Sequence, residues 1–100
     1  MAKHLLIWRI DQTRVPVNAK ERGASWDALL SMVENDLERG AMRDWGVFPG
    51  ENNGYCTFEG SNLELMKVTQ QYSPFVEFTT HPVASILEAK DLIKSLKSSD

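Results

Sequence analysis

Arg9 and Glu77 are the two residues of this sequence whose types and positions suggest chemistry done together. Each lies in an apolar run that predicts a β-strand, Lys3–Ile10 for Arg9 and Phe75–Thr80 for Glu77. We expect these strands to be neighbours, which brings the two charges together. A guanidinium can bind a carboxylate or enolate oxygen while a carboxylate moves a proton. The alternative is a cross-strand ion pair with no further role.

Two more polar residues fall near this pair in the predicted arrangement. Tyr55 begins the run Tyr55–Phe58 and could orient a ligand through its hydroxyl, or form part of an aromatic wall. His81 follows the last predicted strand and could act as a general base at the rim of a site. As a solvent-facing residue before Pro82 it would have no such role. The candidate ligand-binding residues are therefore Arg9, Tyr55, Glu77 and His81, and no residue is assigned as catalytic.

The motifs that mark other kinds of site are missing from the sequence. It has no nucleophile elbow, phosphate-binding loop or dinucleotide fingerprint, and its two histidines are not spaced as metal ligands. The single cysteine, Cys56, excludes an internal disulfide and any Cys-x-x-Cys metal or redox motif. Cys56 is expected on the buried side of its strand, where a thiol is inert. We therefore predict no metal and no cofactor.

Composition limits the function further. The 100 residues are 42% hydrophobic and 25% charged, which predicts one globular domain over residues 1–100. The formal net charge of -3, without a cluster of Lys and Arg, argues against a nucleic-acid partner. The apolar run near the N-terminus is too short for a signal peptide or a membrane span. The expected protein is cytoplasmic and has no membrane contact.

Periodicity and turn residues divide the chain into alternating elements. Apolar residues at helical spacing predict a first helix from an N-cap at Ser25 to Gly40. Ser61 and Glu64 form a capping box that starts a second helix, with Leu63 and Met66 expected on its buried side. Pro82 is expected at the start of a third helix. The predicted strands are Lys3–Ile10, Ala41–Phe48, Tyr55–Phe58 and Phe75–Thr80.

This order, strand, helix, strand, strand, helix, strand and then a C-terminal helix, is typical of the α+β class and of the ferredoxin-like βαββαβ fold. Right-handed crossovers place both main helices on one face of an antiparallel sheet. Trp8 is expected on that covered face. The other face, called the open face here, is expected to carry Leu5, Ile7, Arg9, Tyr55, Thr57, Phe75, Glu77 and Thr79. An uncovered face of this apolar character predicts a homodimer joined through the sheet faces, with a cavity between them and with the last helix or the strand edges extending the contact.

Three short motifs support this arrangement: Leu6-Ile7-Trp8, the stretch from Trp45 to Tyr55, and Phe78-Thr79-Thr80-His81-Pro82-Val83. With them the chain resembles the dimeric α+β barrel superfamily, and most closely a small prokaryotic family of unknown function within it. It is distantly similar to muconolactone isomerases and antibiotic-biosynthesis-type monooxygenases. Gly46 stands where similar sequences often have His, and this departure weakens the transfer of a His-based site.

Three functions follow as alternatives. The resemblance and the open face favour an uncharacterised binding protein that holds a small acidic or aromatic molecule between two sheets. The resemblance also implies a cofactor-independent isomerase or monooxygenase that acts on a small cyclic or aromatic acid. The third alternative is a noncatalytic assembly module, in which side chains fill the space between the sheets. The sequence leaves open whether the protein is an enzyme.

Overall fold

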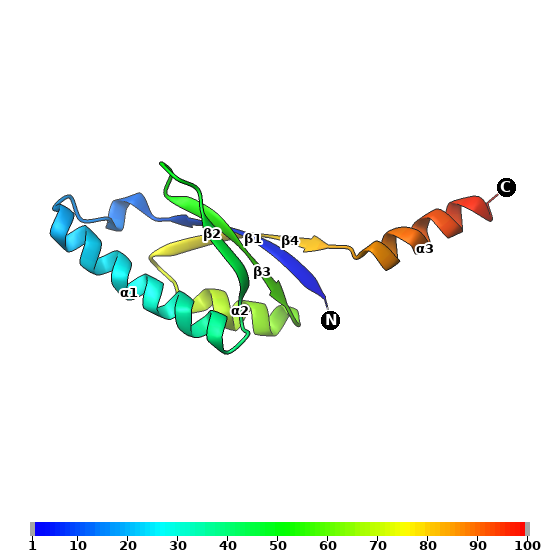
Figure 1. Ribbon diagram of the computed structural model, residues 1–100, viewed down its shortest axis with the longest axis horizontal. Coiled ribbons are helices and arrows are strands. Elements are labelled where there is room, and N and C mark those ends of the chain that lie inside the picture. Colours follow the sequence, from blue (N-terminus) through cyan, green and yellow to red (C-terminus); the bar gives the residue numbers. More distant parts are fainter. Residues whose placement is uncertain (1, 100) are drawn as a thin grey trace.

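The computed structural model describes residues 2–99 and contains one four-stranded antiparallel sheet in the order β2-β3-β1-β4 (Figure 1). Its strands are β1 (Lys3–Ile10), β2 (Arg43–Val47), β3 (Asn53–Glu59) and β4 (Val76–Val83). The helices are α1 (Ala19–Glu38), α2 (Asn62–Gln70) and α3 (Ile86–Lys97), and a short 3-10 turn, η1, spans Gln12–Arg14. The predicted α+β class and ferredoxin-like βαββαβ order are confirmed.

β1 is an apolar central strand of the sheet, with a neighbouring strand on each side. It pairs with β3 on one side and with β4 on the other, and Trp8 lies opposite Gly54 and Phe78 in the two registers. Alternate residues of β1 and β3 turn toward the helices and are buried there: Leu6, Trp8, Cys56 and Phe58. The predicted burial of Trp8 between the sheet and the helices is confirmed.

His4 has the same strand parity as Leu6 and Trp8, and it is buried with them. The Nε2 atom of its ring has no hydrogen-bond partner in the structure, and the ring lies 6.2 Å from that of Phe58 in a tilted arrangement. Strand alternation therefore carries this histidine into the covered face although it stands close to the chain end.

α1 begins earlier than the sequence predicted. Asn18, not Ser25, is the N-cap, and its side-chain oxygen accepts hydrogen bonds from the backbone N–H groups of Lys20 and Glu21. Ser25 lies inside the helix. Gly23 also lies inside the helix, because a glycine costs an exposed helix only about 1 kcal/mol, which the cap and twenty residues of helix offset.

Two other expectations about helices were wrong. The capping box of Ser61 and Glu64 does start α2, but the helix buries Leu65 and Val68 and leaves Leu63 and Met66 exposed. β4 continues through His81 and Pro82 to Val83, so Pro82 does not start a helix. A second capping box, Ser85 with Glu88, starts α3 instead.

α3 leaves the rest of the molecule altogether. It follows β4 outward, beyond the end of the sheet, while α1 and α2 lie on the sheet (Figure 1). The longest dimension of the molecule is consequently 64 Å, against 27 and 19 Å for the other two. None of the residues of α3 is buried.

Candidate functional site

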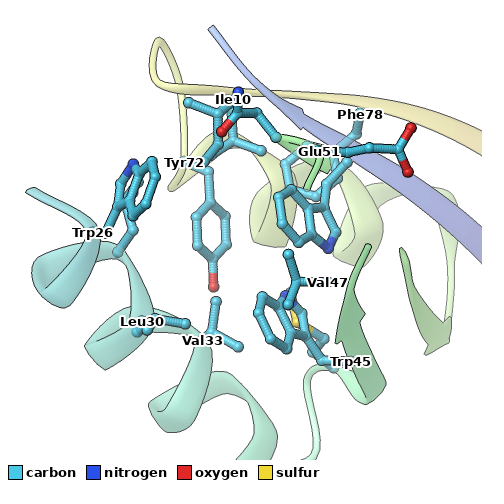
Figure 2. Close-up of a pocket in the computed structure, with 14 residues that line it drawn as sticks. Ile10, Trp26, Leu30, Val33, Trp45, Val47, Glu51, Tyr72 and Phe78 are labelled. Atoms are coloured by element: carbon cyan, nitrogen blue, oxygen red, sulfur yellow. The ribbon is translucent and has the colours of Figure 1, made fainter. Parts of the chain in front are cut away.

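A cavity of about 290 Å³ lies on the helix-covered face of the sheet, under α1 (Figure 2). This volume is near the lower end of the range for small-molecule sites, about 300–1,000 Å³. Most of the lining side chains are apolar. The lining consists of Trp8, Ile10, Trp26, Leu29, Leu30, Val33, Met42, Trp45, Val47, Glu51, Asn52, Tyr72, Val76 and Phe78.

Helical spacing on α1 supplies one wall. Trp26, Leu29, Leu30 and Val33 recur at intervals of three and four residues, so they share one side of the helix, which faces the sheet. In Figure 2, Trp26 and Leu30 lie on the α1 side, with Tyr72 between them and Trp45. The layer between this side of α1 and the sheet is only partly filled.

A β-bulge in β2 helps to form the opposite wall. The register shifts between Arg43 and Gly46, and Asp44 takes a positive φ of 47°. Trp45 then turns toward the helices, and its ring stacks on that of Trp8 with centroids 5.4 Å apart and planes 7° apart. Two parallel indoles thus form a flat, rigid wall.

Two polar groups of the aromatic walls, in Trp8 and Tyr72, are engaged in hydrogen bonds. The indole N–H of Trp8 donates to the backbone oxygen of Tyr55 at 3.3 Å. The Tyr72 hydroxyl donates to Asp36 Oδ2 at 2.6 Å. A ligand in the cavity would therefore meet mainly aromatic faces and aliphatic groups.

Asp36 is a buried structural residue beside the cavity wall that the sequence analysis did not identify. Its carboxylate is fully buried, and its Oδ1 accepts from Arg39 Nη2 at 2.6 Å and from Arg39 Nε at 3.0 Å. Together with Tyr72 it joins the end of α1 to the segment after α2. The signal was present: Asp36 continues the apolar stripe three residues after Val33, and Arg39 follows it by three.

The cavity holds few titratable groups. Among its lining residues these are Glu51, near the mouth, and Tyr72. Burial and the hydrogen bond to Asp36 raise the pKa of Tyr72 above its usual value of 10.0. Burial, with the nearby Asp36 carboxylate, raises the pKa of the Cys56 thiol to about 12. Neither group is poised to exchange a proton near neutral pH.

Three of the four predicted site residues lie together, on the open face and not in the cavity. Arg9 pairs with Glu77 in the strand register, and Arg9 Nη2 is 3.3 Å from Glu77 Oε2. Both side chains are 64% exposed, so the pair is well solvated. Tyr55 lies opposite Ile7, one diagonal step from Arg9.

The Tyr55 hydroxyl donates to Asp44 Oδ1 at 3.1 Å, and this hydrogen bond raises the pKa of the tyrosine. The Tyr55 ring fills the space beside Gly46, where an added Cβ would lie 2.6 Å from Tyr55 Cε1. A histidine at position 46 would therefore require Tyr55 to move.

His81 stands apart from the other three residues. It lies opposite Leu5, four residues beyond Glu77 along β4. At roughly 3.3 Å per residue this separates the two by about 13 Å along the strand. The open face therefore brings together Arg9, Glu77 and Tyr55, with His81 at a distance.

Two other kinds of feature are absent from residues 2–99. No group of three or more His, Cys, Asp or Glu side chains there could hold a metal ion. In the same part of the chain, no helix has the length and apolar character needed to cross a membrane.

Comparison with known proteins gives a family but no function. No curated protein matches the chain. A family model described as a domain of unknown function, DUF3303, matches residues 2–97, almost the full length and including every strand and helix of the described residues. The chain therefore belongs to the DUF3303 family.

Proposed function

We propose that this protein binds a small, flat and largely apolar molecule in the cavity under α1. The observation that carries the proposal is the cavity of about 290 Å³ whose wall includes the stacked indoles of Trp8 and Trp45. Apolar concave sites with rigid aromatic walls are the usual form of a small-molecule pocket. Planar aromatic molecules gain most from such walls because they can stack on them.

The charges near the cavity indicate which molecules it would accept. Among the described residues that line the cavity, Glu51 alone is charged, and its carboxylate points away from the other labelled side chains (Figure 2). A carboxylate ligand in the cavity would lose its hydration without gaining a cation. We therefore infer a neutral aromatic ligand. The sequence predicted an acidic or aromatic molecule on the open face; this proposal keeps the aromatic molecule but places it on the helix-covered face.

Binding is better supported than catalysis. The hydroxyl of Tyr72 is held by Asp36, and no second titratable group of the described lining lies within hydrogen-bond distance of it. A general acid–base mechanism needs a group whose pKa lies near the working pH. The proposed role is therefore that of a binding protein, with the isomerase or monooxygenase alternative kept for the open face.

The proposal can be tested with naphthalene and 2-naphthoate as probes, by following amide chemical shifts in an NMR titration. Leu30→Glu puts a carboxylate at the cavity, whereas Leu37→Glu changes a similarly exposed leucine of α1 that does not line it. We expect naphthalene to shift residues of α1 and β2 in the wild type and in Leu37→Glu. Leu30→Glu should weaken this binding at least tenfold.

Equal binding of naphthalene to both variants would contradict the cavity as the site. So would shifts confined to residues of the open face. Because Leu30 and Leu37 are 42% and 38% exposed, a general loss of stability should affect the two variants alike.

A second proposed site, for an acidic molecule, is supported by the grouping of Arg9, Glu77 and Tyr55 on the open face. In this proposal Arg9 binds a carboxylate in place of Glu77, within a homodimer that covers the face. Guanidinium and carboxylate groups form two parallel hydrogen bonds, which favours planar acids. An enzyme acting on a cyclic acid would use the same residues, with Glu77 moving the proton.

Arg9→Met should abolish binding of 2-naphthoate at this site and leave naphthalene binding under α1 unchanged. A titration of each probe against the variant separates the two sites. Equal binding of 2-naphthoate by Arg9→Met and the wild type would remove Arg9 from the proposal.

A further inference from the structure

The C-terminal helix α3 is amphipathic although none of its residues is buried. Its apolar residues recur at intervals of three and four and form a single stripe, called the α3 stripe here: Ile86, Ala89, Leu92, Ile93 and Leu96. The four large members of this stripe are between 52% and 71% exposed. Leu87 is as exposed as they are but lies off the stripe, between Lys94 and Asp91 around the helix.

Such a helix needs a surface to pack on. The capping box of Ser85 and Glu88 and the lysines of the last turn, Lys94 and Lys97, favour its formation. With twelve residues it is nevertheless no longer than the shortest helices that persist alone in water, about 12–15 residues. The apolar stripe and the helical signals are both explained if α3 docks on another surface.

The same chain has one sheet face that no element of residues 2–99 covers. Both α1 and α2 lie on the other side of the sheet, while α3 points away from it (Figure 1). The centre of this open face includes Leu5, Ile7 and Tyr55, all partly exposed. One chain therefore carries two uncovered apolar surfaces, a convex helix stripe and a sheet face, which cannot meet while α3 extends outward.

We propose that two copies of this chain exchange their C-terminal helices, so that the α3 stripe of each copy docks on the open face of the other. Two-fold symmetry closes this assembly as a dimer, because each copy donates one helix and binds the helix of the other. The dimer would cover both surfaces at once. Direct packing of the two sheets without α3 would leave the α3 stripe in water.

The area involved is sufficient for a stable dimer. Burial of one Leu or Ile side chain removes roughly 60–120 Å² of apolar surface from water. Four large side chains from each of two helices, together with the sheet surface that receives them, bury on the order of 1,000–1,900 Å² in total. Stable protein interfaces bury about 1,200–2,000 Å².

A second copy also fits α3 better than a lipid surface does. Helices that lie on membranes carry mostly Lys and Arg on their polar side. The polar side of α3 includes Glu88 and Asp91 as well as Lys90, Lys94 and Lys97. Anionic headgroups would repel these carboxylates.

The first test is light scattering of the full chain and of three variants at micromolar concentration. Ile93→Glu and Leu96→Glu place a charge on the α3 stripe, and Leu87→Glu places the same charge on an equally exposed leucine beside it. We expect the wild type and Leu87→Glu to be dimers. The two stripe variants should be monomers, with a dissociation constant at least a hundredfold higher.

Folding of the variants can be verified separately, because the three tryptophans lie in the body of the molecule and not in α3. Their fluorescence should be the same in all four proteins. A monomeric wild type would overturn the proposal, and its sedimentation with phosphatidylserine vesicles would then assign the stripe to membranes. Dimers that survive both stripe substitutions would also overturn it, in favour of direct sheet packing.

A cross-linking experiment tests where α3 docks. A double variant carries Ala89→Cys on the stripe and Thr79→Cys on β4 of the open face, and it is treated with a flexible bis-maleimide. Cys56 does not compete, because it is fully buried. Covalent dimers are expected. Monomers with an internal cross-link would show that α3 folds back on its own sheet. The lack of any cross-linked product would exclude the open face as the docking surface. Either result would overturn the proposal.

Discussion

At the scale of single residues, Asp36 has both its side-chain and its backbone oxygens in hydrogen bonds. Its carboxylate accepts hydrogen bonds from the Arg39 side chain and from the Tyr72 hydroxyl. Its backbone oxygen accepts hydrogen bonds from the N–H groups of Ala41 and Met42. These bonds hold the end of α1 and the segments that follow α1 and α2. A buried charge of this kind is tolerated because its oxygens are satisfied. Loss of one partner should consequently be costly.

Tyr72→Phe removes one hydrogen bond from the buried Asp36 and should lower the free energy of unfolding by about 2 kcal/mol, measured by urea denaturation. Tyr55→Phe is the matched control, since its hydroxyl binds the exposed Asp44. The control should change stability by less than about 0.5 kcal/mol. Equal effects of the two substitutions would show that burial of Asp36 does not strengthen its bond to Tyr72.

The raised pKa of Cys56 predicts how stability responds to alkaline pH. The thiol has an ordinary pKa of 9.0 and a pKa of about 12 in the folded protein, so between these values the unfolded chain loses its proton first. Proton loss then favours unfolding, and the free energy of unfolding should fall by up to about 1.4 kcal/mol per pH unit above pH 9. Its contribution is fully present below that pH.

Urea denaturation of wild type and Cys56→Ala across this alkaline range would measure the effect. The variant should show a smaller slope, and what slope remains should decrease further in a double variant with Tyr72→Phe, because the pKa of Tyr72 is also raised. Parallel pH profiles for wild type and Cys56→Ala would contradict burial as the cause.

At the scale of the elements, α1 shows what local sequence signals can and cannot predict. Asn18 followed by Glu21 is a good start signal, yet the sequence analysis placed the start of this helix at Ser25. The helix nevertheless extends over the whole of Ala19–Glu38, because its later residues pack on the sheet. Packing of this kind overrides weak local preferences.

Asn18→Ala should lower the free energy of unfolding by about 1 kcal/mol, because two backbone N–H groups lose their acceptor. Ser25→Ala should leave stability unchanged or raise it slightly, since alanine is the better helix former. Thermal or urea denaturation followed by circular dichroism distinguishes them. A larger loss for Ser25→Ala would place the true start of the helix at Ser25.

Strand alternation, by contrast, predicted the sheet well. The period of two assigned Trp8 and Cys56 to the covered face and Arg9 and Glu77 to the open face, and burial agrees. The cavity could not be predicted in this way, because Trp26, Leu30 and Val33 have the same spacing whether the layer beneath a helix is filled or hollow. Its existence depends on how α1 lies over the sheet and on the bulge at Asp44, neither of which has a local sequence signal.

At the scale of the whole molecule, the extended position of α3 gives the chain its length of 64 Å and separates its apolar stripe from the core. The helical period of this segment was predicted correctly. Its position was not, because periodicity shows that a helix has an apolar side and does not show which surface receives it.

Exchange of α3 links stability to concentration. The melting temperature of the full chain should rise as protein concentration increases, since only the folded state dimerises. A chain shortened to end at Ala84 should keep the sheet, α1 and α2, and its melting temperature should not depend on concentration. Calorimetry of both proteins over a hundredfold range of concentration would test this. Equal dependence in the two proteins would contradict a dimer held by α3.

The stacked indoles of Trp8 and Trp45 also make the protein its own optical reporter. Two indoles with centroids 5.4 Å apart should couple their electronic transitions, and a rotation of one ring against the other within their parallel planes gives a paired positive and negative band in circular dichroism. Trp45→Phe should remove this couplet, whereas Trp26→Phe should retain it because Trp26 is not part of the stack. A couplet that persists in Trp45→Phe would show another origin. A molecule that entered beside the stack would change the signal without any added label.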